Sequence, residues 1–201
     1  MVHDITQGVE TGMKYRIVVV DDEPLIRKGI REILEGAGYD VVAEASDGLD
    51  AVVVCHKHRP DLVLMDINMP LLDGLKAARM IRSEKTAGGI LLVTANTGKE
   101  SVDLAKEAGV IGYVVKPVKE EALLPMVEIA VARAAEIAEL EGDVEEARGQ
   151  LEARKLVDRA KGLLMKTFDI SEDTAYKRLR KLSMDKRCSM KEIAKVIVMN
   201  A

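Results

Sequence analysis

The stretch DLVLMDINMP at residues 61–70 decides the fold of this chain. Residues 62–65 form an unbroken apolar run, which is typical of a strand buried on both faces in the middle of a parallel sheet. Asp66 ends the run, and Pro70 closes the next loop because the residue before a proline avoids the helical region. Doubly wound folds keep their sites at the carboxyl ends of strands. Asp66 is therefore a candidate site residue, although by itself it is equally well explained as a strand end that caps a turn.

The sequence around this stretch repeats the alternation of strand and helix. Helix patterns begin at Pro24, Asp47, Gly74 and about Lys99, and a last one begins near Glu121. Strict alternation implies a parallel sheet with helices on both faces, so we expect an α/β, doubly wound, five-stranded parallel sheet. The predicted strands are residues 15–20, 41–45, 62–65, 89–93 and 112–117, the last with its exit.

Polar residues occupy the carboxyl ends of four of these strands, which meet in one crevice of such a fold. Three carboxylates there repel one another unless a cation offsets their charge, and oxygen ligands without nearby His or Cys suit Mg²⁺. Asp66 could then act as a nucleophile on a phosphoryl group, with Mg²⁺ neutralising the transferring oxygens. Lys116 could pair with those oxygens, and Thr94 could donate a hydrogen bond to them. The set comprises Asp21, Asp22, Asp66, Thr94 and Lys116.

The same residues, with Ala95 and Pro117, resemble the signature of the bacterial response-regulator receiver domain, a flavodoxin-like fold, over residues 14–128. The resemblance implies that Asp66 is the phosphoacceptor for a sensor histidine kinase. It also implies that Asp22, Asp66 and the backbone carbonyl of Asn68 bind Mg²⁺ directly, and that Asp21 does so through water. Thr94 and Tyr113 correspond to the family's switch pair, and a cis peptide is expected before Pro117.

Composition and charge suggest two domains with different partners. Residues 150–201 hold 13 Lys and Arg against 7 Asp and Glu, whereas residues 1–149 hold 17 against 27. Cys55 and Cys188 fit no metal spacing. No apolar run reaches the length of a membrane span and no signal peptide is evident, so we expect a cytoplasmic protein with no membrane partner. Residues 1–13 are expected to be a flexible tail.

A connector helix is predicted over residues 129–151, after Pro125 near the first turn of the last receiver helix. Its apolar residues repeat at coiled-coil spacing over two heptads. This stripe could form a homodimer, or it could fold onto its own chain, and the sequence leaves both open. The stripe consists of Ile137, Leu140, Val144, Ala147 and Leu151.

The basic tail predicts a small all-α bundle of three helices, with new helices opened by Ser171 and Ser189. Its sequence DRAKGLLM at 158–165, with SEDTAY at 171–176 and Leu179-Arg180, resembles the ANTAR domain over residues 137–199. The resemblance implies binding to hairpin loops in nascent transcripts and transcription antitermination, with RNA polymerase as an indirect partner. The expected RNA contacts are Arg159, Lys161, Arg178, Arg180 and Lys181.

We therefore expect a two-component response regulator whose output is RNA binding. Two other interpretations are a DNA-binding regulator and a receiver module whose helical tail binds protein. An enzyme with its own substrate is the least favoured. Phosphotransferases of the haloacid-dehalogenase type also use an Asp nucleophile, but they require a second Asp at the position that Asn68 occupies here.

Overall fold

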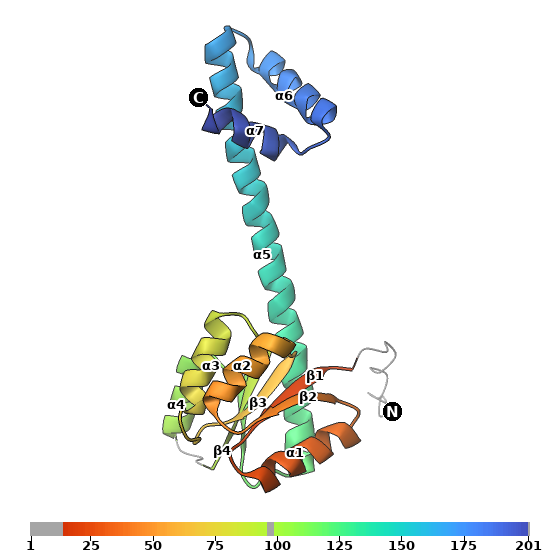
Figure 1. Cartoon of the computed structure of the whole chain (residues 1–201), viewed down its shortest axis with the longest axis vertical. Coiled ribbons are helices and arrows are strands. Elements are labelled where there is room, and N and C mark those ends of the chain that lie inside the picture. The colour runs from red at the N-terminus through yellow and green to blue at the C-terminus, as the bar shows by residue number, and fades with distance from the viewer. Residues whose placement is uncertain (1–13, 96–98, 201) are drawn as a thin grey trace, which may run out of the picture. The chain divides into compact units, whose positions relative to one another are not determined.

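A computed structural model describes residues 14–95 and 99–200, without the side chains of 99–102 and 104. Its sheet has the strand order β2-β1-β3-β4-β5, and all four pairings are parallel (Figure 1). This confirms the predicted doubly wound, five-stranded sheet. The elements of this part are β1 (Arg16–Val20), α1 (Pro24–Gly36), β2 (Asp40–Ala45), α2 (Gly48–His58), β3 (Leu62–Asp66), α3 (Gly74–Ser83), β4 (Gly89–Thr94), α4 (Lys99–Ala108), β5 (Gly112–Val115) and α5 (Glu120–Phe168).

The core follows from the alternation of side chains along buried strands. Successive side chains of a strand point to opposite faces of the sheet. Leu62 and Leu64 of β3 join a cluster with side chains of α1 and α5, whereas Val63 and Met65 join a cluster with side chains of α2, α3 and α4. Because β1, β3 and β4 are apolar on both faces, helices can cover both sides of the sheet, as Figure 1 shows.

Gly74 allows α3 to begin directly beside the end of β3. A Cβ atom at Gly74 would overlap the backbone carbonyl of Asp66, and Asp73 caps the helix by accepting from the backbone N–H of Lys76 at 2.9 Å. This close approach shapes the loop that follows Asp66.

We expect Gly74→Ala to lower the free energy of unfolding by about 1–3 kcal/mol or more, because the added methyl meets fixed backbone. Urea unfolding followed by circular dichroism measures the change. Gly142→Ala is the matched control, because a Cβ there meets nothing within 4 Å and the exposed helix should gain up to about 1 kcal/mol. Equal effects of the two substitutions would contradict the steric explanation.

The helix α5 corrects one expectation about Pro125. The helix begins at Glu120, so Pro125 lies inside it instead of near its first turn. The start at Glu120 agrees with the predicted start near Glu121, and there the carbonyl of Lys119 accepts from the backbone N–H groups of Ala122 and Leu123, at 3.1 and 2.9 Å. Leu123 and Val127, on either side of Pro125, are fully buried against the sheet, and this packing offsets the hydrogen bond that proline removes.

The C-terminal part folds as the predicted three-helix bundle. Contacts divide the chain into two compact units between Ala138 and Glu139, inside the predicted connector. In the second unit the end of α5 packs with α6 (Glu172–Lys186) and α7 (Met190–Met199) around buried Ala160, Ala175, Leu179 and Ala194. Ser171 and Ser189 cap α6 and α7 as expected.

Two further expectations concern the N-terminal tail and membrane-spanning helices. The expected flexible tail, residues 1–13, lies outside them. Among the helices within the described ranges, none is both long enough and apolar enough to span a bilayer.

Candidate functional site

Three carboxylates meet at the carboxyl ends of β1 and β3. Val20 pairs with Met65 in the sheet, so Asp21 and Asp66 are the next residues on neighbouring strands. Asp21 and Asp66 are buried and Asp22 is exposed, and one carboxylate oxygen from each lies within 4.8 Å of the others. The structure thus brings together the acidic residues that the sequence placed at strand ends.

Lys116, at the end of β5, lies between two of these carboxylates. Its Nζ is 2.9 Å from Oδ2 of Asp21 and 2.9 Å from Oδ2 of Asp66, and 3.7 Å from Oε1 of Glu23. Burial lowers the pKa of Lys116, but the hydrogen bonds and charges of Asp21 and Asp66 outweigh burial and raise that pKa above its ordinary value. The ammonium therefore stays charged at neutral pH and offsets part of the negative charge.

The donor set fits a hard divalent cation. Oδ2 of Asp21 is buried and, among the described residues, its one polar partner is the ammonium of Lys116, 2.9 Å away. One ammonium does not balance three carboxylates, and oxygen ligands of this kind suit Mg²⁺. Asp66 is the last residue of β3, and Asp22 and the exposed Asn68 lie in the loops that follow β1 and β3, at the same end of these two neighbouring strands.

The other predicted receiver residues lie on β4 and β5. Thr94, the last residue of β4, is buried, and its carbonyl accepts from the backbone N–H of Lys116 at 2.8 Å. Tyr113 pairs with Leu92 across β4 and β5 and is partly buried in the cluster that faces α2, α3 and α4. The Lys116–Pro117 peptide is cis, which confirms that expectation.

Two residues that contact Asp21, at the start of the loop after β1, were not predicted from the sequence. Glu23 approaches Lys116, and its backbone N–H donates to Oδ1 of Asp21 at 2.9 Å. Arg27 of α1 donates from Nη1 to the carbonyl oxygen of Asp21 at 2.6 Å. The only sequence signal for Arg27 is a basic residue one turn into the helix that follows the Asp pair, a signal too common to single it out.

We expect Lys116→Met to increase the affinity for Mg²⁺ by about tenfold or more, because the competing ammonium is removed from the cluster. The variant should also unfold more easily without Mg²⁺, by about 3–5 kcal/mol, since two buried carboxylates lose their cation. Thermal unfolding across a Mg²⁺ titration measures both effects. Lys119→Met, at an exposed lysine nearby, is the control; a Lys116→Met variant with wild-type Mg²⁺ dependence would contradict the competition.

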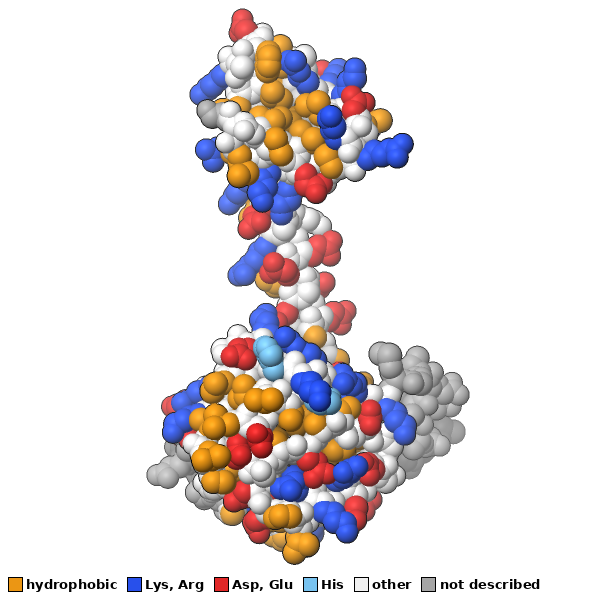
Figure 2. All heavy atoms as spheres, in the orientation of Figure 1, with side chains coloured by type: hydrophobic (Ala, Val, Ile, Leu, Met, Phe, Trp, Pro, Cys, Tyr) orange, Lys and Arg blue, Asp and Glu red, His pale blue; other side chains and the backbone are white. Residues whose placement is uncertain are grey.

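The second unit carries most of the predicted RNA contacts at its surface. Arg159, Arg178, Arg180 and Lys181 are exposed, and Figure 2 shows Lys and Arg side chains around this unit, beside exposed apolar ones. The guanidinium of Arg178 lies over the half-exposed ring of Phe168, 4.1 Å from its centroid. This contact orients Arg178 on the outer face of α6.

Lys161 differs from the other predicted contacts. Its Nζ is 2.8 Å from Oδ1 of Asp158 and 2.7 Å from Oε1 of Glu172, and its side chain is 16% exposed. The hydrogen bonds that Lys161 donates to Asp158 and Glu172 raise the pKa of Lys161, and the bond to Asp158 lowers the pKa of that carboxyl. Lys161 thus links α5 to α6, and its ammonium reaches RNA only by giving up these partners.

Comparison with known families and proteins agrees with both units. The response regulator receiver domain matches residues 17–128, and the ANTAR domain matches residues 145–198. The transcriptional regulatory protein PdtaR of Mycobacterium tuberculosis is 41% identical over 193 residues, which cover 96% of this chain and 94% of that protein. The chemotaxis protein CheY of Bacillus subtilis is 38% identical over 112 residues, or 56% of this chain and 93% of CheY.

Solved structures of receiver-type proteins are also similar to the first unit of this chain. CheY4 of Vibrio cholerae has a TM-score of 0.56 at 31% identity and covers 59% of this chain and 99% of its own. The receiver domain of the sensor histidine kinase PA1611 of Pseudomonas aeruginosa, solved with a magnesium ion in its active-site cleft, has a TM-score of 0.53 at 30% identity. It covers 60% of this chain and 99% of its own. The chain therefore belongs to the response-regulator family, as a member that joins a receiver domain to an ANTAR output domain, the arrangement of an RNA-binding antitermination regulator.

Proposed function

We propose that Asp66 is the phosphoacceptor and that a sensor histidine kinase is the donor. The observation that carries the proposal is the position of Asp66, buried at the end of the central strand between Asp21 and the ammonium of Lys116. In the transfer, a carboxylate oxygen of Asp66 attacks phosphorus and the P–N bond of the kinase phosphohistidine, which is protonated on its other ring nitrogen, breaks. This leaves an acyl phosphate on Asp66 and releases a neutral imidazole that keeps that proton.

The two oxygens of Asp66 have different environments. Oδ1 accepts from the backbone N–H of Ile67 at 2.7 Å, and Oδ2 accepts from Lys116 at 2.9 Å. After phosphorylation, Lys116 is therefore close enough to donate a hydrogen bond to the phosphoryl oxygens instead of to the Asp66 carboxylate. The hydroxyl of Thr94, on the neighbouring strand, is the proposed donor from the other side.

We infer that Mg²⁺ is the cofactor of this site. Asp22 and Asp66 would hold it with the backbone carbonyl of Asn68, and Asp21 would bind it through water. When bound, Mg²⁺ neutralises the oxygens of the transferring phosphoryl group. The buried Asp21 oxygen and the excess of carboxylates over ammonium support this assignment.

Thr94 and Tyr113 are the proposed switch pair. A phosphoryl group on Asp66 would draw the Thr94 hydroxyl toward it, and the Tyr113 ring, only partly buried, has room to turn in behind. These movements of Thr94 and Tyr113 would change the surface of the receiver unit on its α4–β5 side. This provides a route from the phosphorylated carboxylate to the protein surface.

The output we propose is binding to hairpin loops of a nascent transcript, which prevents the terminator from forming and involves RNA polymerase indirectly. The proposed contacts are Arg159, Arg178, Arg180 and Lys181. Lys161 would contact RNA only after its ion pairs with Asp158 and Glu172 break. Loops of RNA expose unstacked bases and phosphates to such side chains. In this proposal the chain is a regulator and does not catalyse a reaction on a separate substrate. Because its target is a nascent transcript, we propose a cytoplasmic location.

We also propose that phosphorylation promotes a homodimer through α5. The large residues of the predicted stripe are 45–58% exposed in the single chain, at Ile137, Leu140, Val144 and Leu151. Pairing two such stripes would bury them and bring two RNA-binding units to one transcript. Sedimentation with and without beryllofluoride, an acyl-phosphate mimic, tests this; identical profiles at all concentrations would exclude a phosphorylation-dependent dimer.

The test of the whole function is binding to a tandem-hairpin RNA by wild type and Asp66→Asn, each with and without acetyl phosphate and Mg²⁺. We expect acetyl phosphate to change the affinity of the wild type alone. Equal, unresponsive binding by both proteins would mean that the tail binds RNA constitutively. Stronger binding to duplex DNA than to hairpin RNA would overturn the RNA output.

A further inference from the structure

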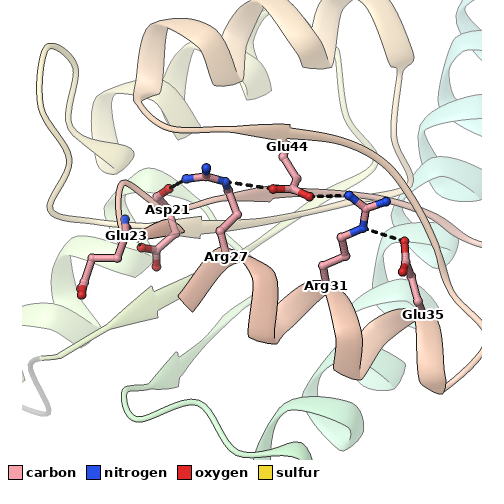
Figure 3. A network of polar contacts seen from close by, with 6 residues as sticks. All are labelled: Asp21, Glu23, Arg27, Arg31, Glu35 and Glu44. Atoms are coloured by element: carbon pink, nitrogen blue, oxygen red, sulfur yellow. Dashed lines mark hydrogen bonds and ion pairs between the residues drawn. The ribbon is translucent and has the colours of Figure 1, made fainter. Parts of the chain in front are cut away.

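A chain of ion pairs runs along α1 and ends on the acidic loop. Arg27 donates from Nη1 to the carbonyl oxygen of Asp21 at 2.6 Å and from Nε to Oε2 of Glu44 at 3.0 Å (Figure 3). Its side chain is only 18% exposed. The guanidinium therefore connects the end of β1 with β2 through two hydrogen bonds in fixed directions.

The partner of Arg27 is itself held in place. Oε1 of Glu44 accepts from Nη1 of Arg31 at 2.8 Å, and Nε of Arg31 donates to Glu35 at 2.8 Å (Figure 3). Glu44 thus lies between two guanidinium groups, and the plane of Arg27 is fixed by its own two hydrogen bonds, from Nε to Glu44 and from Nη1 to the Asp21 carbonyl. Because Glu44 also offsets the charge of Arg27, the contact with Asp21 acts mainly through geometry.

The contact falls on the peptide that joins the two aspartates of the site. The carboxylate of Asp21 is fixed by the backbone N–H of Glu23 and by Lys116. The carboxylate of Asp22 has no hydrogen bond or ion pair with any residue in the described ranges. Its position therefore depends on its backbone, whose preceding carbonyl is the one that Arg27 binds.

We propose that Arg27 is a positioning residue for the metal site. By fixing the Asp21–Asp22 peptide, it holds the Asp22 carboxylate in the direction that a cation shared with Asp66 requires. Residues that orient metal ligands without touching the metal typically change metal affinity by 10–100-fold when they are removed. The inference rests on the proposed Mg²⁺ site and adds to it a residue on α1 that does not contact the cation.

The test is calorimetric titration of the unphosphorylated full chain with Mg²⁺, together with thermal unfolding without Mg²⁺. We expect Arg27→Gln to weaken Mg²⁺ binding by about tenfold or more. Arg27→Lys should recover part of the affinity, since an ammonium can still reach the Asp21 carbonyl. Arg31→Gln is the matched control, because it breaks the same ion-pair chain at Glu44 but leaves the bond to Asp21; its Mg²⁺ affinity should stay within about twofold of wild type.

Three outcomes would overturn the proposal. Wild-type Mg²⁺ affinity in Arg27→Gln would show that the carbonyl contact does not position Asp22. Equal losses of affinity in Arg27→Gln and Arg31→Gln, in step with equal losses of thermal stability, would assign the effect to the stability of the fold. Failure of the wild type to bind Mg²⁺ at all would remove the metal site itself, and with it the positioning role.

Discussion

Asp66→Asn is expected to abolish phosphorylation of the chain by acetyl phosphate or a cognate kinase, with a loss of more than about 100-fold in rate. The reason is chemical: an amide oxygen is a poor nucleophile, and the side chain keeps nearly the same volume at the end of β3. Intact mass, which reports one added phosphoryl group per wild-type chain, measures the result. RNA binding by the variant should no longer respond to acetyl phosphate.

The control for this experiment is Asp73→Asn, which also removes a nearby carboxylate. Asp73 caps α3 through the backbone N–H of Lys76, and asparagine caps helices about as well as aspartate. We therefore expect this variant to fold and to accept one phosphoryl group like the wild type. Phosphorylation of Asp66→Asn at the wild-type rate would place the acceptor on another residue and contradict the assignment.

Replacement of Arg178, Arg180 and Lys181 by Ala is expected to weaken RNA binding by roughly 50-fold at physiological salt. Each phosphate contact on single-stranded RNA contributes about 0.7 to the slope of log affinity against log salt, so three contacts should flatten that slope by about 2. Filter binding or fluorescence anisotropy across a salt series measures affinity and slope together. Circular dichroism should be unchanged, since all three residues are exposed on α6.

A control with the same change of charge separates specific contacts from net charge. Lys177 and Lys191 are ion-paired with Asp173 and Glu152, and Lys195 is exposed on α7. Their triple Ala variant removes three positive charges from the same unit, yet we expect it to lose less than about fivefold in affinity. An equal loss in both triple variants would mean that the unit attracts RNA by its overall charge, without the α6 contacts we propose.

The receiver fold was predictable because its signals are local. A strand buried on both faces needs an apolar run, and residues 17–20, 62–65 and 90–93 each supply one. Turn and capping residues then mark where each helix begins, and Ser171 and Ser189 do so correctly for α6 and α7. Asp21 and Asp66 were predicted to lie close together because both stand at the carboxyl ends of parallel strands.

Where sequence reasoning fell short, packing was the deciding factor. Pro125 was expected near a helix start, but the burial of Leu123 and Val127 on the sheet sustains the helix through it. Lys161 is one of the predicted RNA contacts, and the sequence does not show that it lies between Asp158 and Glu172. A long side chain of this kind has several partners of similar energy within reach, and only the packed helices decide among them.

By itself, the sequence determined the sheet, the order of the polar residues at the strand ends and the three-helix tail, because apolar periodicity and capping act over a few neighbouring residues. Only the tertiary structure decided that Lys116 contacts Asp66, 50 positions earlier in the chain, and that Arg27 binds the carbonyl of Asp21. Such contacts depend on which strands lie side by side and in what register, and on how helices pack across them. Those relations are set by the burial of the whole core, so no short stretch of the chain specifies them.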